Sequence, residues 1–171
     1  FLLWILAILF YKGFSAFSLD LFLNKTPGPD SENGGLGNAI IGSLMIVVSC
    51  ALISTPIGIL AGIYLSEYGA SSKIASITRF VNDIMLSAPS IVIGLFVYAM
   101  VVVPSKHFSG WAGTVALSLI AIPVVVRTTE NMLKLVPVSL REAAFALGAP
   151  KWKVSTSVVL KAARSGVITG L

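Results

Sequence analysis

The chain has 171 residues, of which 56% are hydrophobic and only 11% are charged. Soluble domains carry about 25% charged residues, so this composition excludes an ordinary water-soluble enzyme, a disordered tail and a coiled coil. It indicates an integral membrane protein. A single Cys, a single His and the lack of a GxxxxGK[ST] pattern exclude an internal disulfide, a Cys-based zinc site and a P-loop for ATP. We therefore expect no metal site and no cofactor.

Uncharged runs predict the transmembrane helices in chain order. Residues 1–11 are expected to end a first span, and the second span is expected at about 39–66. The third uncharged run covers 84–105, the fourth covers 111–126, and a fifth begins at 165. We therefore predict an all-α, polytopic transmembrane helical bundle. The chain is expected to form a single domain, 1–171, and to be a fragment of a longer polypeptide.

The Lys and Arg residues between the spans predict the orientation. Segments 67–83 and 127–164 together contain nine of them, whereas 12–38 and 104–110 contain three. The positive-inside rule therefore places 67–83 and 127–164 in the cytoplasm. Segment 127–164 alone holds seven basic and two acidic residues, which accounts for the whole net charge of +5. That distribution marks the cytoplasmic side of the protein and gives no reason to expect a nucleic-acid partner. Membrane lipid is an expected partner because the chain is predicted to be an integral membrane protein.

Small and helix-breaking residues occur within the predicted spans. Residues 58–62 and 166–170 form GxxxG patterns, which permit close approach of two helices. Pro56, Pro89 and Pro123 are expected to kink the spans or to mark backbone that faces a cavity. Ordinary helix packing is the simpler interpretation of these residues.

The cytoplasmic segment predicts a helix, a glycine turn and a second helix. Ser139 and Glu142 fit a capping box, with Ser139 as the N-cap of a helix of roughly eight residues. Gly148 is expected in the left-handed conformation after this helix, and Pro150 can open the next one. So short a helix is marginal alone. It is therefore expected to dock on a partner, the alternative being a hairpin that rests on lipid headgroups.

The residues of this hairpin resemble a known family. Glu142-Ala143-Ala144, followed after three residues by Gly148, is similar to the EAA motif in the membrane subunits of binding-protein-dependent ABC importers. Lys161 stands where the family pattern has a proline. The runs 88–98 and 127–152 resemble the phosphate-importing branch of this family.

This resemblance implies a type I ABC importer permease fold, of which the chain would cover about four to five of six spans. It implies a multi-pass protein of the bacterial inner membrane that takes part in ATP-driven uptake of inorganic phosphate. Its expected partners are two ATPase subunits, a second homologous permease and an extracytoplasmic phosphate-binding protein. The permease itself would not be an enzyme, since ATP hydrolysis would belong to the ATPase subunits. Another oxyanion, such as sulfate or molybdate, is the alternative substrate.

The resemblance also implies a role for the hairpin. Segment 127–164 would be the cytoplasmic coupling segment, and its helix would sit in a cleft of the ATPase. The residues that would couple the two proteins are Glu142, Ala143, Ala144 and Gly148. A glutamate can pair with a basic group across such an interface, and alanines leave room for close approach.

Arg127 and Glu130 are candidates for the substrate path at the inner end of the fourth span. Arginine offers a dianionic phosphate both positive charge and several donors, and Glu130 would keep it from binding the anion too tightly. The alternative is a local ion pair at the membrane boundary, and Arg79 and Asp83 are expected to be boundary charges. A membrane scaffold or an intramembrane enzyme is a second functional class, but no ionisable residue lies at the centre of a predicted span.

Overall fold

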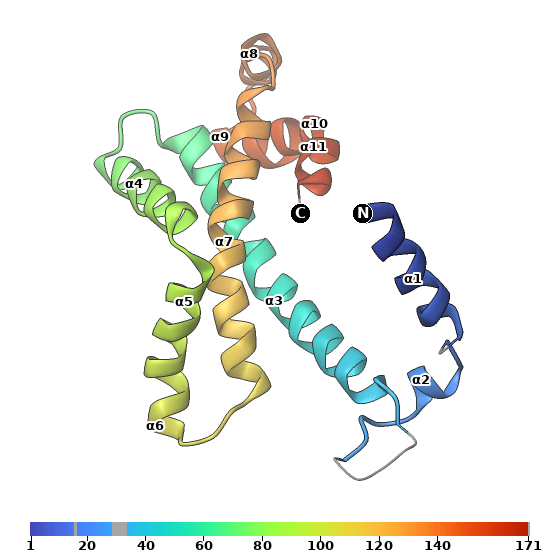
Figure 1. The fold of residues 1–171 in the computed structure, drawn as a ribbon. Coiled ribbons are helices and arrows are strands. Elements are labelled where there is room, and N and C mark those ends of the chain that lie inside the picture. The colour runs from blue at the N-terminus through green and yellow to red at the C-terminus, as the bar shows by residue number, and fades with distance from the viewer. Residues whose placement is uncertain (16, 29–33, 171) are drawn as a thin grey trace. The chain divides into compact units, whose positions relative to one another are not determined.

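The computed structural model describes residues 1–15, 17–28 and 34–170, which form helices and no strands (Figure 1). This confirms the predicted all-α fold. Two helices are long and apolar enough to cross a membrane, Gly37–Tyr68 and Gly110–Lys134, and a bent pair of helices supplies a third candidate. The chain divides into two compact units, Phe1–Ile46 and Val47–Leu171. Each unit is described by itself.

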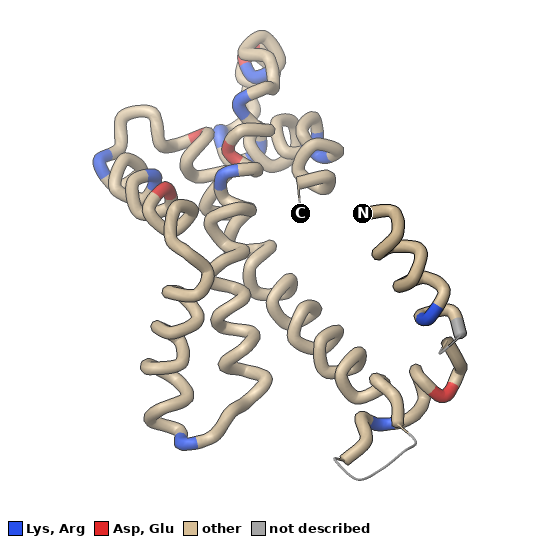
Figure 2. Tube along the Cα trace, in the orientation of Figure 1, with Lys and Arg blue, Asp and Glu red and all other residues tan. Residues whose placement is uncertain are grey.

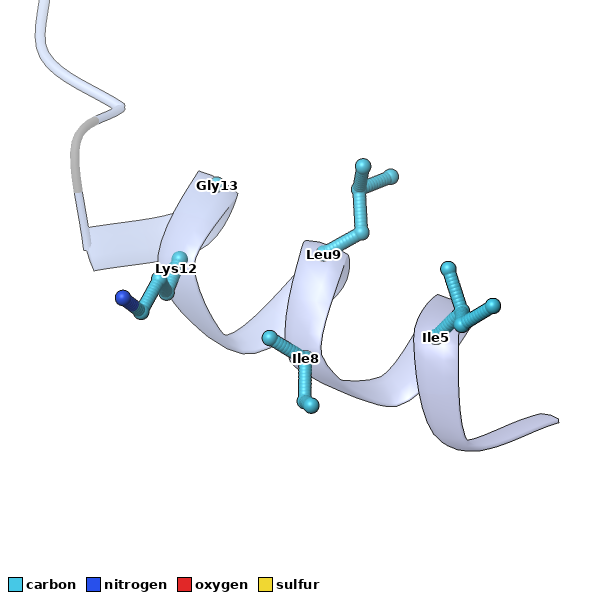
Figure 3. A pocket seen from close by; sticks show the side chains of 5 residues that line it. All are labelled: Ile5, Ile8, Leu9, Lys12 and Gly13. Atoms are coloured by element: carbon cyan, nitrogen blue, oxygen red, sulfur yellow. The ribbon is translucent and has the colours of Figure 1, made fainter. Parts of the chain in front are cut away.

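The first unit contains α1 (Leu2–Ser15), α2 (Asp20–Leu23) and the beginning of α3 (Gly37–Ile63). Backbone hydrogen bonds attach α2 and the residue after it to the beginning of α3: Leu36 N–H, just before α3, donates to Leu21 O at 2.7 Å, and Gly37 N–H donates to Asn24 O at 3.0 Å. The Thr26 backbone N–H and hydroxyl both donate to Asn38 Oδ1, at 2.9 and 2.8 Å. Figure 3 shows the apolar side chains of Ile5, Ile8 and Leu9 that project from α1. No residue predicted for the functional site lies in this unit.

The second predicted span appears as α3, which continues into the π-helical turn η1 (Tyr64–Tyr68). Pro56 lies within α3. In the described part of the chain, this helix carries no charge before Glu67 in η1. The predicted span is therefore confirmed, and the helix extends slightly beyond both predicted ends.

The third uncharged run is not one straight helix. It is divided between α4 (Lys73–Ser87) and the series α5 (Ser90–Val97), η2 (Tyr98–Val102) and α6 (Val103–Ser105), with a bend of 102° between the two parts. Ala88 is extended at the bend because the following residue, Pro89, disfavours the helical conformation before it. The predicted kink at Pro89 is confirmed, and the uncharged run 84–105 begins inside α4 and continues from Ser90 in α5.

Helix α7 (Gly110–Lys134) runs through the second unit and packs against α4, α5, η1 and α11 (Arg164–Thr169) (Figure 1). A Cβ added at Gly62 would lie 2.6 Å from Thr129 Cβ, and one added at Gly166 would lie 2.6 Å from Met132 Sδ. Both GxxxG patterns therefore approach another helix closely, as predicted, and in both cases that helix is α7. The fifth predicted run appears as α11, and its last residue, Leu171, lies outside the described residues.

The segment after α7 forms a hairpin and a small core. Its elements are α8 (Val138–Ala146), α9 (Lys151–Lys153), η3 (Val154–Val159) and α10 (Leu160–Ala162). Buried apolar side chains from α7, α8, η3 and α11 pack together: Leu133, Val136, Ala144, Val154, Val159, Ala163 and Val167. Figure 2 shows that the charged residues of this unit gather around this region, η1 and α4, with the exception of Lys106 between α6 and α7, whereas α5 and the first half of α7 carry none.

Candidate coupling and substrate-path site

The coupling helix begins earlier than the capping box predicts. Pro137 is its N-cap, α8 starts at Val138, and no side chain caps it. Ser139 is therefore already inside the helix, and Glu142 lies in its second turn. Pro137 sets this boundary because its ring fixes φ, here −57°, and because it has no N–H to satisfy. The predicted capping box of Ser139 and Glu142 is wrong.

The glycine turn after α8 is as predicted. Gly148 has φ +78° and is the one glycine with positive φ among the described residues. Its N–H donates to Phe145 O at 2.9 Å, and Ala149 N–H donates to Ala144 O at 3.3 Å. A Cβ added at Gly148 would meet no atom within 4 Å. The backbone conformation, and not crowding, therefore favours glycine here.

The structure divides the four predicted coupling residues between two environments. Glu142, Ala143 and Gly148 are exposed, whereas Ala144 is buried in the small core beside Val136. Ala144 therefore holds the hairpin against its own chain. The exposed apolar end of the helix is Leu147, whose exposed fraction is 89%.

Arg141 fixes the hairpin through three hydrogen bonds that sequence reasoning missed. Its Nη2 donates to Glu67 Oε1 at 2.9 Å and to Leu133 O at 2.8 Å, and its Nη1 donates to Val136 O at 2.5 Å. Both side chains of the ion pair are largely covered, with exposed fractions of 17% for Arg141 and 7% for Glu67. The two residues are 74 positions apart in sequence, so no local pattern indicates the pair.

A second contact joins the hairpin to η1. Lys151 Nζ lies 4.6 Å from the centre of the Tyr68 ring, which is within the range of a cation–π interaction. Lys151 is the first residue of α9, and Tyr68 directly follows Glu67. Both helices of the hairpin therefore contact consecutive residues of one π-helical turn.

Glu130 lies at the centre of a charge cluster between α4 and α7. Its Oε1 accepts from Arg79 Nε at 2.8 Å and from Lys134 Nζ at 2.7 Å, and only 1% of its side chain is exposed. Arg79 also donates to the carbonyl oxygens of Leu65 at 2.7 Å and Gly69 at 3.5 Å. Arg79 is therefore more than the boundary charge that was expected, since it connects α4 to both η1 and α7.

Arg127 pairs with Asp83 and not with Glu130. Arg127 Nη1 lies 3.8 Å from Asp83 Oδ1, and both side chains are well exposed, at 45% and 56%. Glu130 instead meets Lys134, four residues on, where side chains of a helix lie on the same face. The expected local pair of Arg127 and Glu130 is thus replaced by two separate clusters, and Arg127 is the more accessible charge.

The described residues contain no cluster of side chains suited to binding a metal ion. Within residues 1–15, 17–28 and 34–170, no group of three or more His, Cys, Asp or Glu side chains is placed to hold a metal ion. The charged groups at the end of α7 are instead suited to binding an anion at Arg127 and to joining helices around Glu130.

Comparison with known proteins places this geometry in a family. Residues 54–171 match the family described as binding-protein-dependent transport system inner membrane component. The phosphate transport system permease protein PstA of Yersinia pestis is 58% identical over 170 residues, covering 99% of this chain and 58% of that protein. The protein of the same name from Pasteurella multocida is 61% identical, with 99% and 60% covered. The chain thus spans about three fifths of the length of these relatives.

A solved structure shows the same fold. An inward-facing form of the MetNI methionine ABC transporter matches with a TM-score of 0.64 and 24% identity, covering 80% of this chain and 64% of that chain. This likeness concerns the fold alone. Together with the family match over residues 54–171, it shows that the chain belongs to the binding-protein-dependent transport system inner membrane components and has the fold of an ABC importer permease.

Proposed function

We propose that the chain is part of the membrane-spanning permease subunit of an ATP-driven importer that translocates inorganic phosphate. The observation that carries this proposal is the identity of 58% and 61%, over 170 residues, to two proteins named phosphate transport system permease protein. The uncharged helices α3 and α5, and the uncharged residues 110–126 of α7, are suited to a membrane pathway. Sulfate or molybdate is the alternative cargo, and the first experiment below distinguishes them.

The exposed α8–α9 hairpin supports a division of labour between subunits. Glu142 and Ala143 present a charged and a small surface on a short helix, and Gly148 sets the turn that follows it. The sequence has no P-loop, so ATP hydrolysis belongs to two separate ATPase subunits on which this hairpin docks. A second permease completes the membrane pathway, and an extracytoplasmic phosphate-binding protein delivers the anion.

Arg127 is proposed to contact the translocated anion. It lies about 10 Å before the cytoplasmic end of α7, its side chain is accessible, and its partner Asp83 is beyond hydrogen-bond distance at 3.8 Å. A phosphate dianion can therefore compete for the guanidinium, and the carboxylate of Asp83 limits how tightly it is held. Glu130 contributes indirectly, because its ion pair with Arg79 of α4 fixes α4 beside Arg127.

The proposed cargo is tested in proteoliposomes that contain the full-length subunit with its partner permease, ATPases and binding protein. ATP-dependent uptake of radiolabelled phosphate is measured with sulfate and molybdate as competitors. We expect phosphate uptake that neither competitor reduces. Uptake of sulfate or molybdate without phosphate uptake would overturn the proposed cargo.

The role of Arg127 is tested in the same preparation. Arg127→Ala is expected to abolish uptake, and Arg127→Lys to reduce it, because the ammonium keeps the charge but loses the planar fork. Arg164→Ala removes an exposed arginine elsewhere in the cytoplasmic segment and serves as the matched control, with uptake expected as in the wild type. Normal uptake by Arg127→Ala would remove Arg127 from the path.

The role of the hairpin is tested with Glu142→Lys and Gly148→Pro. Both variants are expected to insert into the membrane and to lose uptake, because the first reverses a charge on the docking surface and the second cannot adopt φ +78°. Lys73→Ala, an exposed lysine at the start of α4 and outside the hairpin, is the control. Uptake at the wild-type rate in either test variant would contradict the assignment.

A further inference from the structure

We propose that η1 receives the motion of the coupling hairpin, and that Arg141 is the positioning residue that holds α8 on η1 through Glu67. This inference rests on the proposed function, since it concerns how the hairpin passes a movement to the membrane helices. The proposed contact connects the hairpin to a helix that is not its neighbour in sequence. The hairpin follows α7 in sequence, whereas η1 ends α3.

The geometry of Arg141 suits this role. One guanidinium joins three parts of the molecule, because it donates to the carboxylate of Glu67 in η1 and to the carbonyl oxygens of Leu133 and Val136 where α7 ends. The last carbonyls of a helix lack intrahelical partners and carry partial negative charge. Arginine is the residue that can serve all three acceptors, since its donors are arranged in a rigid fork.

The second helix of the hairpin meets η1 at the next residue. Lys151 of α9 stacks on the ring of Tyr68, beside the Glu67 contact of α8. The hairpin therefore contacts η1 on both sides of its glycine turn, once through α8 and once through α9. With two contacts, the hairpin cannot pivot on η1 about a single point. A displacement of the hairpin as one body would move η1, and with it the part of α3 that belongs to the same unit.

The same turn also holds α4. Arg79 donates to Leu65 O in η1 and to Gly69 O just after it, and its Nε pairs with Glu130 of α7. In a π-helical turn the backbone hydrogen bonds span five residues instead of four. Leu65 O lies in this turn, and it is the carbonyl oxygen that accepts from Arg79. η1 thus connects the hairpin with α3, α4 and α7, which include both helices that carry the proposed Arg127–Asp83 path.

The experiment compares uptake with ATP hydrolysis in the complete importer in proteoliposomes. Glu67→Gln keeps the shape and an acceptor oxygen but removes the charge, Arg141→Lys keeps the charge but not the fork, and Arg141→Ala removes both. Phosphate transported per ATP hydrolysed is expected to fall about tenfold in Arg141→Ala and less in the two conservative variants. Lys73→Ala removes an exposed lysine at the start of α4 that forms no ion pair in the described part of the chain, and it is expected to keep the wild-type ratio.

A rescue experiment separates positioning from general stability. In a Cys50→Ala background, the pair Glu67→Cys and Arg141→Cys is expected to show the low ratio. Treatment with a short crosslinker that joins two thiols is expected to restore at least half of the wild-type ratio, because the covalent link replaces the ion pair. The α8 amides of the double-cysteine variant are expected to exchange hydrogen for deuterium faster than those of the wild type. Crosslinking is expected to slow this exchange.

Two results would overturn the inference. One is a wild-type ratio in Arg141→Ala, and the other is a linked pair whose α8 amides are protected but whose ratio stays low. Failure of the wild-type importer to take up phosphate would instead refute the proposed cargo. In that case the number of anions transported per ATP hydrolysed is measured with the anion that the importer does transport. The hydrogen–deuterium exchange of α8 can be measured without any transported anion.

Discussion

Replacing Gly62 with alanine is expected to push α3 and α7 apart. The added Cβ would lie 2.6 Å from Thr129 Cβ, 2.8 Å from Thr129 Cγ2 and 3.0 Å from Val126 O. Carbon atoms in favourable contact are about 3.5–4.0 Å apart, so the helices would have to separate by about 1 Å at this crossing. Neither Thr129 Cβ nor the carbonyl of Val126 can move away by a side-chain rotation.

The size of the effect follows from two opposing contributions. Overpacking by a methyl group costs about 1–3 kcal/mol, and alanine regains up to about 1 kcal/mol over glycine within a helix. The net loss is therefore up to about 2 kcal/mol. For a chain of this size, each kcal/mol lowers the melting temperature by about 2–4 °C, so a fall of several degrees is expected.

The assay is thermal unfolding of the purified importer in detergent, followed by circular dichroism. Gly94→Ala is the matched control, because a Cβ added at that helical glycine would meet no atom within 4 Å. The control is expected to melt at the wild-type temperature or slightly above it. If Gly62→Ala melts together with Gly94→Ala, the close crossing of α3 and α7 does not exist as described.

Three other predictions concern single positions. In Gly148→Val, a residue with a Cβ must adopt φ +78°, which costs about 1–2 kcal/mol. This variant should lower uptake more than Gly148→Asn, because asparagine tolerates the left-handed conformation. Equal uptake by both variants would argue against a left-handed turn. Glu130→Leu leaves the cations of Arg79 and Lys134 without their carboxylate. Because both cations are partly exposed to solvent, the loss in thermal unfolding is expected to be about 1–2 kcal/mol. An unchanged melting temperature would show that the cluster contributes little. Because the Leu147 side chain is 89% exposed, Leu147→Ala should leave stability within about 0.5 kcal/mol of the wild type. The same variant should weaken ATPase binding in a pull-down titration. Unaltered binding would remove Leu147 from the docking surface.

Features that depend on a single residue type or on local hydropathy were predictable from the sequence. The uncharged runs located α3 and α7, because a membrane-crossing helix needs an apolar length that few other structures require. Gly148 indicated the left-handed turn and Pro89 the bend before α5, because each residue restricts its own backbone or that of its neighbour. The GxxxG patterns predicted close helix contact but not that both would contact α7.

The pairing of charges was not predictable, because it depends on which helices meet. Arg79 and Glu130 are 51 positions apart, and Arg141 and Glu67 are 74 apart. The nearest opposite charges in sequence were therefore a poor guide, as the separation of Arg127 from Glu130 shows. The start of α8 was also misplaced, since a capping box can be read around residue 139 while Pro137 sets the boundary.

The bend at Pro89 has a consequence for the depth at which water reaches the protein. Beyond the bend, the bent pair continues as Ser90–Ser105, and this length alone reaches about 24 Å, against about 30 Å of hydrocarbon in a typical bilayer. Such hydrophobic mismatch is relieved by local thinning of the bilayer. Asp83 lies on the α4 side of the bend, so headgroups and water drawn in by the short crossing would hydrate the exposed charges of Asp83 and Arg127 at that depth.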